Sequence, residues 1–100
     1  VEPIRDAGNF AVRTDTLVEK LLVEGGRVTG VQVRRGGVVQ SLLARRGVIL
    51  SAGAFNSPQI LMLSGIGPAA HLKAHGIEVV LDRAGVGGNL QDHIDYVSGW

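Results

Sequence analysis

The chain has 100 residues, the size of one small domain, so a second complete domain is not expected. Hydrophobic residues make up 45% of it, which is enough to build a core. The formal net charge is +1, the basic residues are scattered, and aromatic residues are only 4% of the chain. Nucleic-acid binding therefore gains no support, because it calls for a basic stripe or patch.

The sequence contains no cysteine, which excludes disulfides, thiolate metal sites and a cysteine nucleophile. No apolar run approaches the roughly 20 residues of a membrane-spanning helix, so we expect no membrane span. The chain opens without a methionine and ends at Trp100 inside a strand-like run. We therefore expect that both ends were cut from a longer protein.

The first half of the chain has the pattern of β structure. An apolar run at Phe10–Thr14 is followed by three segments rich in strand-forming residues: Leu17–Val23, Val28–Arg34 and Val38–Leu43. Gly25-Gly26 and Gly36-Gly37 separate these segments, and paired glycines form tight hairpin turns. The sequence predicts a three-stranded antiparallel meander over about residues 10–44.

The second half begins with the pattern of a strand–turn–helix unit over residues 47–64. The wholly apolar run Val48-Ile49-Leu50 is expected of a strand buried on both faces of a parallel sheet. Small residues follow at Ser51–Ala54. Ser57 then has the character of a helix N-cap and Pro58 that of a first helical residue, which predicts a short helix over Pro58–Leu63.

Four more elements are expected after Gly65. They are a helix from Pro68 to His75 that stops at Gly76, a strand at Ile77–Leu81, a glycine-rich loop at Ala84–Gln91, and the beginning of another strand at His93–Trp100.

The junction between the apolar run and the first helix is the candidate site. A helix N-terminus brings backbone N–H groups and a positive dipole end to one place, which can accept a phosphate. Ala52 and Gly53 would be small because a larger side chain would occupy the space of the ligand. The alternative is that small residues merely allow a strand and a helix to pack tightly, and both interpretations stay open.

Other patterns favour structural interpretations. Gly65–Ala70 follows a helix rather than a strand, and Gly85–Leu90 departs from the dinucleotide motif at its last position, so both indicate turns. His71 and His75 have a spacing that could grip a metal, but a solvated helix end is favoured. Asp92–Asp95 is interpreted as alternating polar residues on a strand.

The fifteen residues Gly53–Gly67 (GAFNSPQILMLSGIG) closely resemble the second signature of the glucose–methanol–choline (GMC) family of flavoenzymes. Further segments are similar to that family along nearly the whole chain: Asn9–Thr14, Leu21-Leu22, Gly30-Val31, Pro68–Leu72 and Val86–His93. The signature is long and therefore specific.

This resemblance implies an α/β fold: part of a Rossmann-like FAD-binding domain with the three-stranded antiparallel meander inserted, running into the substrate domain. Residues 1–92 would belong to the FAD-binding domain and residues 93–100 would begin a substrate-domain strand. Family members bind FAD and oxidise alcohols by transferring a hydride to the flavin. By resemblance, the backbone of Val18 contacts the adenine and Ala52-Gly53 lies beside the ADP half of FAD. With Ser57 at the expected helix start, these residues form the expected cofactor-binding set.

No catalytic residue follows from the resemblance. The family's N-terminal G-x-G-x-x-G has no match in this chain, and His71, His75 and His93 do not match its C-terminal catalytic pair. The leading hypothesis is a segment of an FAD-dependent alcohol oxidoreductase of the choline-dehydrogenase-like branch, without a metal. Its expected partners are a small-molecule alcohol and the remainder of the parent chain. The alternatives are a non-catalytic nucleotide-binding or interaction scaffold and, third, an NAD-dependent dehydrogenase.

Overall fold

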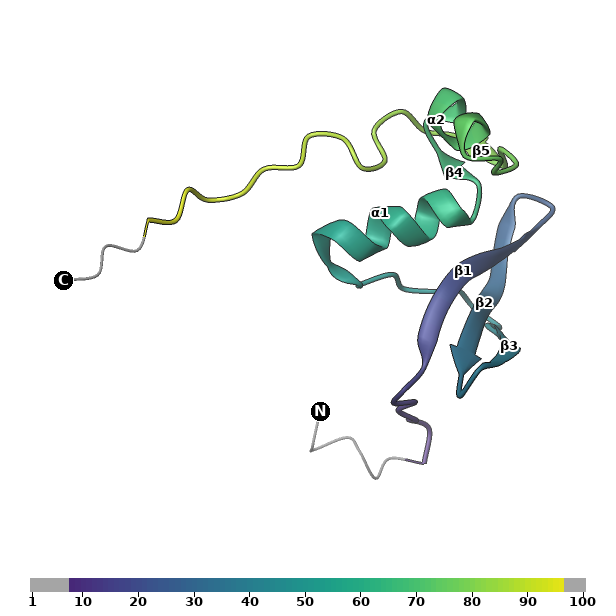
Figure 1. The fold of residues 1–100 in the computed structure, drawn as a ribbon. Helices are drawn as coiled ribbons and strands as arrows, with labels where there is room; N and C mark the ends of the chain where they lie inside the picture. Colours follow the sequence, from purple (N-terminus) through teal and green to yellow (C-terminus); the bar gives the residue numbers. More distant parts are fainter. Residues whose placement is uncertain (1–7, 97–100) are drawn as a thin grey trace. The chain divides into compact units, whose positions relative to one another are not determined.

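The computed structural model describes residues 8–96 (Figure 1). The chain divides into two compact units, one ending at Val48 and one beginning at Ile49, and each is described by itself. Within the described residues, no helix is long and apolar enough to cross a membrane.

The first unit contains the expected meander. Its strands are β1 (Leu17–Glu24), β2 (Arg27–Arg35) and β3 (Val38–Leu43). They pair antiparallel in the order β1-β2-β3. The glycines of both connecting turns have positive φ, which non-glycine residues rarely adopt. Both turns and the strand order confirm the prediction from sequence.

The pairing of β1 with β2 is interrupted by two β-bulges. Val18 pairs with Val33 and Lys20 with Gln32, so Glu19 is an extra residue on β1. On the other side of the hairpin, Thr29 is the extra residue on β2, and its hydroxyl donates a hydrogen bond to the backbone of Leu22. The bulges twist the hairpin and re-aim the residues beside them, Val18 among them.

Close packing of β2 against β3 depends on Gly30. A Cβ on this residue would lie 2.2 Å from the carbonyl oxygen of Leu42 on the neighbouring strand. Gly30 itself is buried, as are the side chains of Leu21 and Val33. The sheet therefore needs glycine here for space rather than for an unusual φ angle.

The second unit alternates helices with very short strands. These elements are α1 (Gly53–Leu63), β4 (Ile66–Gly67), α2 (Ala69–Ala74) and β5 (Leu81–Asp82), with β4 parallel to β5. Ile60, Ser64 and Leu72 are buried between them, and Leu72 is fully buried. The Ser64 hydroxyl is satisfied by donating to the carbonyl of Ile60.

The N-terminus of α2 is capped from outside the helix. Its N-cap residue is Pro68, and the Asp82 carboxylate on β5 accepts a 3.0 Å hydrogen bond from the Ala69 N–H. A carboxylate at this position satisfies an orphan donor and interacts favourably with the helix dipole. The last turn ends at His75, followed by Gly76 with φ +68°, as the sequence predicts.

The structure corrects the predicted strand–turn–helix unit. Val48–Leu50 has irregular backbone within the described chain rather than a strand, and Ile49 is 93% exposed. A strand buried on both faces needs hydrogen-bonded neighbours, and none of the described residues pairs with this run. Only β4 and β5 pair in parallel among the described residues.

The start of α1 was also predicted wrongly. The helix begins at Gly53 rather than at Pro58, and Pro58 lies inside it. Proline is tolerated at the first helical position, but here the helix accepts it one turn later and gives up one backbone hydrogen bond. Ser57 is consequently an interior residue of the helix and not its N-cap.

Four weaker expectations met different outcomes. Phe10–Thr14 is exposed irregular chain. The strand expected at Ile77–Leu81 is reduced to Leu81–Asp82. Its partner strand, Ile66–Gly67, lies in a segment for which the sequence predicts a turn. The loop at Ala84–Gln91 is confirmed. Residues 93–96 are irregular, because alternating residues do not make a strand without a paired neighbour, and no described strand pairs with them. The rest of the strand expected at His93–Trp100 lies outside the described residues.

Candidate functional site

The turn that leads into α1 brings three of the predicted site residues together. The Ala52 N–H donates a 3.0 Å hydrogen bond to the Ser57 hydroxyl, which closes the turn around Gly53. Gly53 has φ +86°, and no described atom lies within 4 Å of the place a Cβ would occupy. Glycine is therefore required here by its backbone conformation, and the space beside it is open.

The first turn of α1 presents an uncompensated positive end. Ala52 is the N-cap residue, it makes no side-chain hydrogen bond to the first turn, and the first turn has no acidic residue. Ala54 and Phe55 are exposed there. The first N–H groups of a helix have no partner within the helix, and the dipole places roughly half a positive charge beside them. This arrangement suits an anion such as a phosphate.

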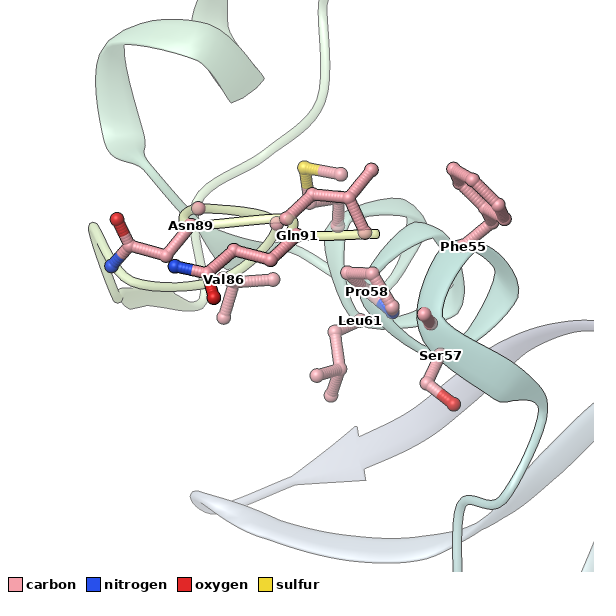
Figure 2. Close-up of a pocket in the computed structure, with 12 residues that line it drawn as sticks. Phe55, Ser57, Pro58, Leu61, Val86, Asn89 and Gln91 are labelled. Carbon is pink, nitrogen blue, oxygen red and sulfur yellow. The ribbon is translucent and has the colours of Figure 1, made fainter. Parts of the chain in front are cut away.

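A groove of roughly 680 Å³ runs along the same helix. Figure 2 shows its lining, which comes from α1 and from the loop at residues 86–91. The apolar surface is provided by Phe55, Pro58 and Leu61 on the helix, and the loop adds the polar side chains of Asn89 and Gln91. An apolar groove with a few polar groups at its edge is the usual form of a small-molecule site.

The loop side of this groove was not identified from the sequence. The glycine-rich pattern predicts a loop at Ala84–Gln91 but says nothing of which helix it packs beside. Asn89 has φ +54°, a left-handed conformation that asparagine adopts more readily than most residues, and Gly87 has φ +77°. These two residues let the loop turn back along α1, and an Asn after closely spaced glycines is the signal that could have indicated it.

The fourth predicted site residue, Val18, lies in the other unit, on β1. It is half-buried and pairs with Val33 directly before the bulge at Glu19. The Glu19 carboxylate accepts hydrogen bonds from Gln32 Nε2 at 2.8 Å and from Arg34 Nε at 2.6 Å. These two hydrogen bonds, of which the one from Gln32 has the larger effect, hold the pKa of Glu19 below its ordinary value of 4.5. These contacts of Glu19 with Gln32 and Arg34, the Glu19 clamp, fix the bulge beside Val18. The sequence analysis did not predict the clamp.

The histidines do not assemble into catalytic machinery in the described part of the chain. His71 and His75 lie at the exposed end of α2, as predicted, with their rings edge to face. His93 lies in exposed irregular chain, where its backbone N–H donates to the Asp92 carboxylate. Within residues 8–96, no group of three or more His, Cys, Asp or Glu side chains could hold a metal ion.

Comparison with known sequences identifies the family. The sequence profile of the GMC oxidoreductase family matches residues 1–95. The oxygen-dependent choline dehydrogenase of Rhizobium meliloti (strain 1021) is 60% identical over 77 residues, which are 77% of this chain and 14% of that protein. The enzyme of the same name from Brucella ovis is 57% identical over 76 residues, again 14% of its length. The chain thus spans about one seventh of these relatives.

Solved structures of related enzymes have a fold similar to that of this chain. An FAD-dependent oxidoreductase from Chaetomium thermophilum superposes with a TM-score of 0.81 at 32% identity, covering 85% of this chain and 15% of that one. A pyridoxine 4-oxidase from Mesorbium loti gives a TM-score of 0.75 at 33% identity, covering 82% and 16%. With 95 of its 100 residues matched by the family profile, the chain belongs to the GMC oxidoreductase family.

Proposed function

We propose that this chain is a segment of an FAD-dependent, choline-dehydrogenase-like alcohol oxidoreductase, and that it helps to bind the ADP half of FAD. The observation that carries the proposal is the open turn at Ala52-Gly53 leading into the uncapped N-terminus of α1. Family membership and relatives named as choline dehydrogenases support the cofactor and the reaction class.

The residues of the turn fit a pyrophosphate-bearing ligand. Gly53 leaves room for close approach to the backbone, and the first N–H groups of α1 can donate to phosphate oxygens. Ser57 holds the turn by accepting a hydrogen bond from the Ala52 N–H, and a hydroxyl that accepts can also donate its hydrogen. Val18, beside the bulge on β1, would contact the adenine through its backbone.

The chemistry that FAD supplies is acceptance of a hydride from the alcohol. None of the chain's histidines matches the family's proton-handling pair, so this segment would bind and orient the cofactor rather than move the alcohol proton. The groove along α1 would then help to exclude water from the bound cofactor.

The competing function is a scaffold that keeps the nucleotide site without the chemistry. The absorbance spectrum of the full-length parent protein separates the two. We expect visible flavin bands that bleach when choline or another primary alcohol is added without oxygen. A colourless protein that does not regain flavin on incubation with FAD would favour the scaffold and overturn the proposal.

A further inference from the structure

The two histidines of α2 form a matched pair that the proposed function does not use. His71 is the third residue of α2 and His75 is its C-cap residue, four positions later. Both side chains belong to exposed residues. Their ring centroids are 4.7 Å apart, with an angle of 67° between the ring planes.

This separation is compatible with a metal ion shared by the two rings. A metal–nitrogen bond of about 2.0–2.1 Å and a ring radius of about 1.15 Å place each centroid about 3.2 Å from the ion. Two such rings at the 90° angle of square-planar or octahedral coordination have centroids about 4.5 Å apart, and at a tetrahedral angle about 5.2 Å. The observed 4.7 Å falls between these values, so both rings can bind one ion once side-chain rotation turns a nitrogen of each toward it.

The pair also borders a cavity with room for further ligands. His71 and His75 line a hollow of roughly 440 Å³ together with Met62 and Gln59 of α1. The Met62 thioether and the Gln59 amide oxygen are neutral donors, and none of the side chains that line the hollow is acidic. A site of neutral imidazoles, with water or a thioether completing it, selects late transition metals over Mg²⁺ or Ca²⁺.

We propose that His71 and His75 form a two-histidine binding site for a late first-row divalent metal ion, with Cu²⁺ bound most tightly. Copper heads the order of affinities that nitrogen ligands show for these metals. The ion would link the last turn of α2 to its C-cap residue and so stabilise the end of the helix. This inference is independent of FAD binding, because it rests on residues outside the Ala52–Ser57 turn.

The test uses the full-length parent protein, stripped of metal with a chelator and titrated with Cu²⁺ by calorimetry. The buffer is kept near neutral or slightly alkaline, because imidazole binds metals only in its neutral form. The variants are His71→Gln, His75→Gln and the double substitution, and His93→Gln is the matched control. His93 is an exposed histidine outside the pair.

We expect each single variant to weaken one Cu²⁺ equivalent by at least about tenfold, since losing even an outer partner of a metal ligand costs about 10–100-fold. The double variant should lose that equivalent, while the control keeps it. Electron paramagnetic resonance should show coupling of this copper to two nitrogen nuclei in the unsubstituted protein. Unchanged copper stoichiometry and affinity in the double variant would overturn the proposal, as would equal losses in the His93 control.

Discussion

An acidic residue in the first turn of α1 should weaken FAD binding while leaving the helix intact. Ala54 is exposed, lines the groove and occupies the second position of the helix. A glutamate there would compete with a phosphate for the same positive helix end. By the same dipole argument, Ala54→Glu should stabilise the empty helix by about 0.3–1 kcal/mol. Binding and stability should therefore move in opposite directions.

The size of the binding defect follows from the helix geometry. One turn of helix rises 5.4 Å, so a carboxylate in the first turn lies about 6–8 Å from an anion held on the N-terminal N–H groups. Two unit charges at that separation repel by about 2–3 kcal/mol at an effective dielectric constant of about 20. Salt reduces this to about 1–2 kcal/mol, which raises the Kd by roughly 5–30-fold.

The assay is titration of the flavin-free, full-length protein with FAD and, separately, with ADP. Ala54→Gln is the matched control, because it has the same size without the charge. We expect both ligands to bind the glutamate variant more weakly, the control to resemble the unsubstituted protein, and riboflavin to be indifferent to either change. If Ala54→Glu bound ADP as tightly as Ala54→Gln does, the phosphates would not lie at this helix end.

Three further predictions concern the scaffold and are measured on the full-length protein by thermal unfolding and local amide exchange. Gly30→Ala places a Cβ against the Leu42 carbonyl and should destabilise the meander by at least about 2 kcal/mol, whereas Gly47→Ala meets no described atom within 4 Å and should change stability by less than about 1 kcal/mol. Asp82→Ala removes the cap of α2 and should cost about 0.5–2 kcal/mol. Glu19→Gln should destabilise the meander at neutral pH, with the difference from the unsubstituted protein shrinking in acid.

The sign of the last effect follows from the lowered pKa of Glu19. Its contribution is fully present above the ordinary pKa of 4.5 and is lost as the pH falls through the lower pKa of the folded state. A stability difference that grew in acid would contradict the clamp. Equal destabilisation by Gly30→Ala and Gly47→Ala would contradict the close approach of β2 and β3. If Asp82→Ala made amide exchange faster at β5 but left it unchanged in α2, the capping role of Asp82 would be contradicted.

The sequence predicts the meander well because its signals are local. Strand-forming runs and Gly-Gly turns dictate both the elements and their neighbours. The bulge at Glu19 was not predictable in the same way. It depends on two side chains 13 and 15 residues away, Gln32 and Arg34, whose register only the folded hairpin establishes.

The sequence predicts which residues form the turn of the candidate site but not the role of Ser57 or the start of the helix. Ala52, Gly53 and Ser57 do lie together, but Ser57 closes the turn from inside α1 instead of capping it. The proline rule misplaced the helix start, because Gly53 supplies a left-handed residue from which the helix can begin earlier. The partnership of α1 with the loop at 86–91 is tertiary, and periodicity carries no information about it.

Amide hydrogen exchange of the full-length protein, with and without ADP, tests most directly whether the Ala52–Ser57 turn binds the ADP half of FAD. The account predicts that ADP slows exchange in peptides covering the first turn of α1 by at least about tenfold, because donated N–H groups are protected. Peptides covering β3 serve as the internal reference. Protection by ADP that appears elsewhere in the protein while this turn exchanges as before would contradict the account.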